Sequence, residues 1–392
     1  MEGTEQIAYH PEHYRTSRPF FPSLYRTFRD TCDQDDGFPT ASGMMALEGK
    51  FISIWNAELD RLSVADRPAN TKRFNEEISI FSHVARCVYN GRNIFHLQPA
   101  LSSLLRATDV DDVQWSAIKL PYSSFYLWFG PQKDWPLAAS HYVDGAYIET
   151  TMRNGIQVTL TSAANIYPDS QHQNFVRDFD PYYYASFTIP PDKEATVGET
   201  LKATLENDPS FHPERQQRSN SEQSPLSNDE GIVIRQLPKE QSGWYEAALE
   251  HQANLPIFMQ ALRLVINGLC FLSAEPDDTV YAFPPQALEL IQSERKYSEV
   301  SQNIGKREIQ RLRQLGYTEI HFCGNKFVQA ANQQGNTGTG TEVSPHRRRA
   351  FWRNQTCGPG NSERRPKWIK PTIVRRDKLR QDEDAPGHTY IV

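Results

Sequence analysis

The chain has 392 residues, a formal net charge of −6 and 38% hydrophobic residues, which is enough for one large core or two ordinary domains. Its first residues lack a basic segment followed by an apolar run, so we expect no secretory signal peptide. The most apolar stretch, LPIFMQALRLVINGLCFLSAEP, contains Arg263 and Asn267 and falls short of a clean membrane span. We therefore expect a soluble, cytoplasmic protein without membrane association.

Cysteine usage argues against a metal or disulfide framework. The five cysteines are odd in number, and none has a CxxC or CxH spacing: Cys32, Cys87, Cys270, Cys323 and Cys357. Zinc ribbons and disulfide-stapled domains both need tighter clustering. We interpret these residues as reduced thiols and predict no metal and no other cofactor.

The first half of the chain predicts helices followed by strands. Apolar residues recur at intervals of three and four over about 40–115, which favours helices. The aromatic segment SSFYLWFG favours a strand, and AYIETTMRNGIQVTLTSA predicts a hairpin that turns at Asn154-Gly155. YYYASFTI predicts a further strand. In TVGETLKATLEN, Thr196 and Glu199 have the spacing of a capping box at a helix start.

The second half contains one long apolar helix and two segments without periodicity. The helix is predicted from about Gly243 to Ser273, with a break near Leu255-Pro256. Ser, Gln, Pro, Gly and charge dominate the aperiodic segments, which predict flexible connections. The predicted organisation is a helical and β-rich N-terminal body (1–207), an insertion (208–230), a helical part completing the body (231–331), a linker (332–344) and a basic β element (345–392).

The predicted fold class is therefore α+β. It combines a helical N-terminal part, an antiparallel sheet core with packed helices, and a C-terminal basic β-ribbon. This last element differs from the rest of the chain in charge. Residues 345–380 hold 12 Lys and Arg and two acidic residues, a net charge of +10, so the rest of the chain carries −16. A basic element on an acidic body indicates contact with a polyanion, or docking of the element onto its own body.

Within this element, PHRRRAFWRN and PKWIKPTIV are predicted to be two strands. TCGPGN supplies the glycine turn that joins them. Arginine pairs with phosphate, and tryptophan stacks on unpaired bases. The alternative for the tryptophans is a place in the core. The predicted RNA-binding residues are Arg347, Arg348, Arg349, Trp352, Arg353, Arg364, Arg365, Lys367, Trp368 and Lys370.

A histidine beside the arginines permits a second chemistry. His346 would act as general acid or base, and Arg348 or Arg349 would stabilise the charge that develops in phosphodiester cleavage. This pattern makes a toxin-like endoribonuclease the alternative function. A simpler interpretation gives His346 a structural hydrogen bond.

The same segment resembles the C-terminal signature of a family of phage and mobile-element proteins whose described member is a type V-A anti-CRISPR. AIKLPYSSFYLWF and INGLCFLSAEPDDTVY resemble two further segments of that family. The positions that match the C-terminal signature are Pro345, His346, Arg348, Arg349, Trp352, Arg353, Trp368, Ile369, Pro371 and Val374.

The resemblance implies a regulatory binding protein that serves evasion of host defence. Such a protein recognises an N-terminal peptide of its target during synthesis, and the target's mRNA and expression then fall. The implied partners are this peptide and RNA or the ribosome, which the ribbon would contact. Ala350 and Phe351 replace a Gly-His pair of the family, which disfavours catalysis and leaves a binding role intact.

Overall fold

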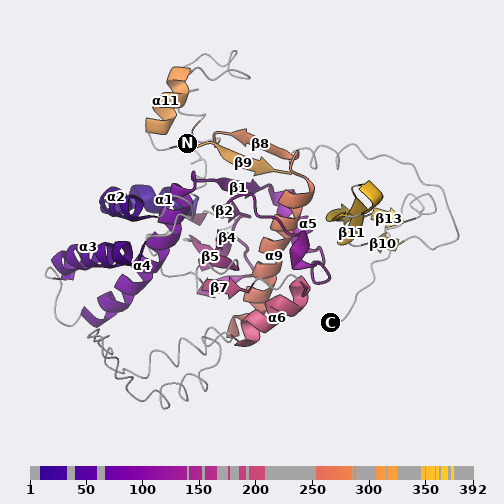
Figure 1. Cartoon of the computed structure of the whole chain (residues 1–392), viewed down its shortest axis with the longest axis horizontal. Coiled ribbons are helices and arrows are strands. Elements are labelled where there is room, and N and C mark those ends of the chain that lie inside the picture. Colours follow the sequence, from indigo (N-terminus) through magenta and orange to yellow (C-terminus); the bar gives the residue numbers. More distant parts are fainter. Residues whose placement is uncertain are drawn as a thin grey trace.

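The computed structural model describes residues 9–32, 40–59, 67–138, 141–151, 155–165, 175–176, 185–190, 194–207, 253–284, 287, 306–314, 317–324, 346–348, 350–357, 359–361, 363–369 and 372–374. Within them, a mixed sheet has helices on both faces, and the C-terminal strands lie outside the second helical layer (Figure 1). The α+β class predicted from the sequence is confirmed.

The sheet has nine strands among the described residues. They are β1 (Ile94–Leu97), β2 (Ser124–Trp128), β3 (Pro136–Ala138), β4 (His141–Thr150), β5 (Ile156–Asn165), β6 (Phe175–Val176), β7 (Ala185–Ile189), β8 (Thr279–Ala282) and β9 (Ile320–Cys323). The order is β6-β5-β4-β2-β1-β9-β8, with β3 on β4 and β7 on β5. The interior strand β1 pairs in parallel with both β2 and β9, whereas the other pairs are antiparallel.

Two helical layers cover the sheet. The first layer holds α1 (His10–Ser17), α2 (Phe21–Thr31), α3 (Ala41–Leu59) and α4 (Arg67–Tyr89), and the second holds α5 (Pro99–Arg106), α6 (Val197–Asn207) and α9 (Leu255–Ala274). A further helix, α11 (Lys306–Gln314), precedes β9. Alternate residues of β2 divide between the two cores, because Phe125 and Leu127 pack with the second layer and Tyr126 packs with the first. The sheet is therefore covered on both faces.

Locally encoded features are confirmed. β4 and β5 form the predicted hairpin, which closes where the Thr151 N–H donates to the Gly155 carbonyl at 2.9 Å. The predicted capping box also forms, since the Thr196 N–H donates to Glu199 Oε2 at 2.9 Å and the Glu199 N–H donates to Thr196 Oγ1 at 3.3 Å. Each depends on residues a few positions apart.

The prediction of helix throughout 40–115 is wrong in part, because β1 interrupts it. Gly91 and Arg92 both have positive φ (94° and 58°) and end α4. The run Ile94–Leu97 is apolar except for His96 and is buried on both faces of the sheet, and a short, mostly apolar run does not distinguish a buried strand from a buried helix. The predicted insertion (208–230) and linker (332–344) lie outside the described residues.

α9 is the principal core helix. By length and composition alone it is apolar enough to cross a membrane, in contrast to the sequence expectation, yet 67% of its most apolar window is buried inside the protein. Two of its polar residues illustrate how they are satisfied in the fold: Arg263 Nε donates to Asp111 Oδ1 at 2.9 Å, and Asn267 Nδ2 donates to the Thr108 carbonyl at 3.0 Å. Burial in the core therefore accounts for the apolar composition.

The N-terminal layer contacts the sheet through a buried tyrosine–histidine pair. Tyr9 Oη lies 2.8 Å from His96 Nδ1, and the imidazole ring lies 4.4 Å from the Trp128 ring and 5.0 Å from the Phe322 ring. This burial lowers the pKa of His96 from 6.5 to about 4.

We expect this histidine to make stability depend on pH. The unfolded chain binds a proton at His96 at higher pH than the folded chain does. The contribution of neutral His96 to the unfolding free energy is therefore fully present above pH 6.5 and is lost as the pH falls through about 4. The shift corresponds to about 3 kcal/mol. The unfolding free energy of His96→Gln should therefore fall less steeply than that of the wild type between pH 7 and 4.5. Identical slopes would contradict the assignment.

Candidate functional site

The basic C-terminal element forms a ribbon with one more strand pair than predicted. Its elements are β10 (His346–Arg348), β11 (Phe351–Cys357), the short helix η4 (Pro359–Asn361), β12 (Glu363–Ile369) and β13 (Thr372–Val374). β11 pairs with β12 and β10 pairs with β13, both antiparallel. The predicted glycine turn lies at η4, where Gly360 has a φ of 64°. We call β10–β13 the ribbon.

The two tryptophans of the ribbon lie in the core. Trp352 and Trp368 are directly opposite each other in the β11–β12 register, and their rings stack with centroids 6.0 Å apart. Only 7% and 4% of these residues is exposed, and Trp368 meets the Phe271 ring of α9 edge-on at 6.0 Å. This corrects the expectation that they stack on RNA bases, because neither ring presents a face to solvent.

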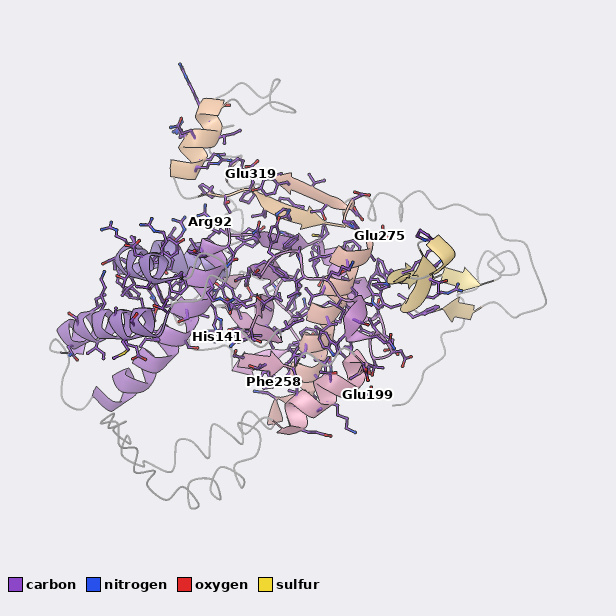
Figure 2. The ribbon with its side chains drawn as sticks, in the orientation of Figure 1. Arg92, His141, Glu199, Phe258, Glu275 and Glu319 are labelled. Carbon is purple, nitrogen blue, oxygen red and sulfur yellow. The ribbon has the colours of Figure 1, made fainter. Side chains whose placement is uncertain are left out.

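One buried amide connects the ribbon to the body. Trp352 Nε1 donates to Asn267 Oδ1 at 2.6 Å, and Asn267 Nδ2 donates to the Thr108 carbonyl. Asn267 lies on α9, whose C-terminal end is followed by Glu275 (Figure 2). A polar group that is 1% exposed needs such partners. The amide therefore holds the ribbon, α9 and the segment after α5 in a fixed relation.

The face turned away from α9 is cationic. Arg353 and Lys367 are exposed and directly opposite each other in the register. Like charges in this position oppose strand pairing by up to about 1 kcal/mol. A bound anion would relieve that repulsion, so the pair is suited to contact with phosphate groups.

The remaining predicted site residues are only partly described. The backbones of His346, Arg347 and Arg348 lie in β10, and those of Arg364 and Arg365 lie in β12, whereas Arg349 and Lys370 lie outside the described residues. The catalytic roles assigned to His346, Arg348 and Arg349 therefore stay predictions. At the family's Gly-His position, Ala350 is buried, and Phe351 forms an isolated bridge to Asp109.

A second polar cluster, missed by the sequence analysis, lies between α4 and the sheet. His83 Nδ1 is 2.7 Å from Glu149 Oε2, and His83 Nε2 is 3.2 Å from Thr159 Oγ1. The hydroxyl of Ser124 donates to Glu149 Oε1 at 3.1 Å. The Arg86 guanidinium lies 3.5 Å from the same carboxylate. Burial lowers the pKa of Arg86, and Glu149 opposes that effect.

This cluster positions α4. The carboxylate of Glu149, the imidazole of His83 and the hydroxyl of Thr159 form a hydrogen-bonded chain, but all three residues are buried, so the described arrangement does not present them to solvent. The sequence carries one indication of this cluster. His83 and Arg86 are three residues apart in the largely apolar run ISIFSHVARCVY, a spacing that places both on one helix face. Among the described residues, no group of three His, Cys, Asp or Glu could hold a metal ion.

The body and ribbon define the class of protein: a mixed sheet between two helical layers, with a basic ribbon docked on the core helix. The sequence matches the AcrVA2-like family, the anti-CRISPR type V subtype A2 family, over residues 95–376, and the chain belongs to this family. The match runs from β1 to just beyond β13, so α1–α4 precede it.

The crystal structure of AcrVA2 is similar with a TM-score of 0.42 and 11% identity, over 93% of this chain and 97% of that chain. The comparison with curated proteins gives no match.

Proposed function

We propose that this protein, a type V-A anti-CRISPR protein by family, acts while its target is being made. It recognises the N-terminal peptide of the nascent target in the cytoplasm and lowers the target's mRNA and expression. The ribbon contacts RNA or the ribosome during this step. The observation that supports the proposal most directly is the pair of exposed cations, Arg353 and Lys367, on a ribbon whose other face is docked on the body.

Charge distribution supports the same assignment. Residues 345–380 carry a net charge of +10 and the rest of the chain carries −16. A polyanion is therefore attracted to the ribbon and repelled by the body. Because Trp352 and Asn267 hold the ribbon in place, its cationic face keeps a constant position relative to any peptide that the body binds.

Co-expression with a type V-A RNA-guided nuclease tests the proposal. We expect the nuclease mRNA and protein to fall several-fold, whereas an unrelated reporter transcript persists. The double variant R353Q/K367Q should lose most of this effect, because it removes the opposed cations. Unchanged nuclease mRNA in the presence of wild-type protein would overturn the proposed function, even if nuclease activity fell.

The matched control removes the same charge elsewhere. Arg29 and Lys202 are exposed cations on α2 and α6, so R29Q/K202Q should behave as the wild type. Binding of purified protein to single-stranded RNA adds a direct measurement. Losing two phosphate contacts should make the slope of log K against log salt shallower by about 1.4. If this slope is unchanged in R353Q/K367Q, Arg353 and Lys367 do not contact RNA phosphates, and the ribbon has no part in RNA binding.

A further inference from the structure

We infer that the outer edge of β8 binds an extended peptide as one more antiparallel strand of the sheet. Among the described residues β8 is the last strand in the order β6-β5-β4-β2-β1-β9-β8, and it pairs only with β9 (Figure 1). Adding an extended peptide to a sheet edge is a common mode of recognition. The backbone then supplies the hydrogen bonds, and alternate side chains supply the selectivity.

The register determines which backbone groups of β8 face outward. The Gly324 N–H donates to the Asp278 carbonyl at 3.0 Å, so these two residues are a hydrogen-bonded pair at the start of the ladder. Such pairs alternate along an antiparallel ladder, so Val280 also directs its N–H and C=O toward β9. Thr279 and Tyr281 therefore direct theirs away from β9. Within the part of the chain that the structure describes, no hydrogen bond reaches these four outward groups.

The edge of β8 has little protection against strand addition. Its sequence, TVYA, contains no charged residue and no proline, and no bulge interrupts its register with β9. Shortness is the one protective feature that it has. Val280 is 49% exposed and Tyr281 is 56% exposed, and as neighbours on a strand they project from opposite faces of the sheet. An added strand would cover both side chains.

A peptide suits this edge better than a second copy of the chain. The edge offers two outward-facing residues, whereas stable interfaces between folded proteins bury about 1,200–2,000 Å². An extended segment needs no such area, because its own unpaired backbone groups bond to the edge. Identification of this segment with the target's nascent N-terminal peptide rests on the proposed function, since a chain that is still being made has not yet paired its backbone.

A row of rings beside the edge favours an aromatic side chain in the ligand. Phe95, His321 and Tyr281 are cross-strand neighbours on β1, β9 and β8. The ring centroids are 4.5 Å apart for Phe95 and His321, and 4.7 Å apart for His321 and Tyr281. Burial lowers the pKa of His321, so its ring is uncharged at neutral pH. An aromatic residue opposite Tyr281 would continue the row, since cross-strand aromatic pairs stabilise a sheet.

The remaining surroundings of the edge also suit an uncharged ligand. On the other face of the sheet, Val280 favours a β-branched partner. Arg313 and Glu319, two charged residues near the Tyr281 ring, pair with each other at 3.1 Å, so this pair leaves no net charge for a ligand to match. The ligand is therefore a segment in which aromatic and β-branched side chains alternate.

N-methylated peptides test the inference on the wild-type chain. The probe is acetyl-Lys-Thr-Phe-Val-Phe-Thr-Lys-amide with fluorescein on its last lysine, and its Val would lie opposite Val280. N-methylation of the first Phe removes the donor to the Tyr281 carbonyl, whereas N-methylation of the Val blocks an N–H that points away from β8. By fluorescence anisotropy, we expect the first change to weaken binding about tenfold and the second by less than about twofold.

Two variants at one position separate the backbone from the ring. Y281A removes the ring and keeps the outward N–H, so it should weaken binding about threefold. Y281P removes this N–H as well. Because the group points outward, the bonds to β9 stay intact, as they do for prolines on natural edge strands. Y281P should therefore weaken binding at least about tenfold.

Equal effects of the two N-methyl groups, absence of binding, or equal affinities of Y281A and Y281P would each overturn the site. So would a dimer of the free chain that Y281P abolishes, because a second copy would then occupy the edge. The peptide comparison needs no variant, so it decides the matter even if Y281P misfolds. Binding without loss of nuclease mRNA would contradict the proposed function alone, and loss of nuclease mRNA without binding would contradict this site alone.

Discussion

Trp352→Ala is expected to release the ribbon from the body. The substitution deletes a buried ring that stacks on Trp368 and leaves Asn267 Oδ1 without its donor inside the core. Truncation of a buried tryptophan costs about 3–5 kcal/mol. Because the ribbon packs against α9 rather than within the sheet, the loss should appear as local opening. Hydrogen exchange should then accelerate over Phe351–Ile369, whereas β4 and β5 keep their protection.

Two further substitutions separate the effect of the lost ring from that of the lost hydrogen-bond donor. Trp352→Phe retains an aromatic ring but removes the Nε1–H, so it should cost about 1–3 kcal/mol through the unpaired amide oxygen of Asn267. Arg353→Ala changes the adjacent, exposed residue and should not lower the unfolding free energy by more than about 0.5 kcal/mol, because it also removes the repulsion from Lys367. Normal protection of the ribbon in Trp352→Ala would contradict the docking described above.

Glu149→Ala is expected to destabilise the whole body. The carboxylate accepts from Ser124 and pairs with His83 and Arg86. Without it, the buried Arg86 guanidinium loses its ion pair with Glu149, and breaking a buried pair in this way costs about 3–5 kcal/mol. The midpoint of urea unfolding should fall accordingly.

A compensating change provides the control. The double variant Glu149→Leu with Arg86→Met removes both charges and should recover most of the lost stability, because apolar replacement of a buried pair is often neutral. Glu149→Gln, which keeps the shape and one oxygen acceptor, should lie between the wild type and Glu149→Ala. If the unfolding free energy of Glu149→Ala lies within about 1 kcal/mol of that of the wild type, the cluster does not hold α4 in place.

The features predicted correctly from the sequence are those that neighbouring residues determine. The hairpin at Gly155, the capping box at Thr196 and Glu199, and the glycine turn of the ribbon each need only a few consecutive residues. Family membership also follows from a contiguous signature, and it agrees with the match over residues 95–376.

The features that were missed depend on distant partners. Trp352 belongs to the core because Asn267 lies 85 positions earlier on α9, and no local pattern distinguishes a buried strand face from an RNA-stacking one. His83 acquires its role from Glu149, 66 positions later. Likewise β1 is a strand because β2 and β9 flank it, although its own four residues continue an apolar helical pattern.

The parallel pairing of β1 with β9 imposes an order on the protein's own maturation. β1 ends at Leu97 and β9 begins at Ile320, so one edge of β1 stays open until more than 220 further residues have been polymerised. At about 5–20 residues per second this takes roughly 10–45 s. Throughout that interval an unpaired, apolar edge invites wrong pairing. A chain that stalls before Ile320 should therefore depend on chaperones, whereas the finished chain should not.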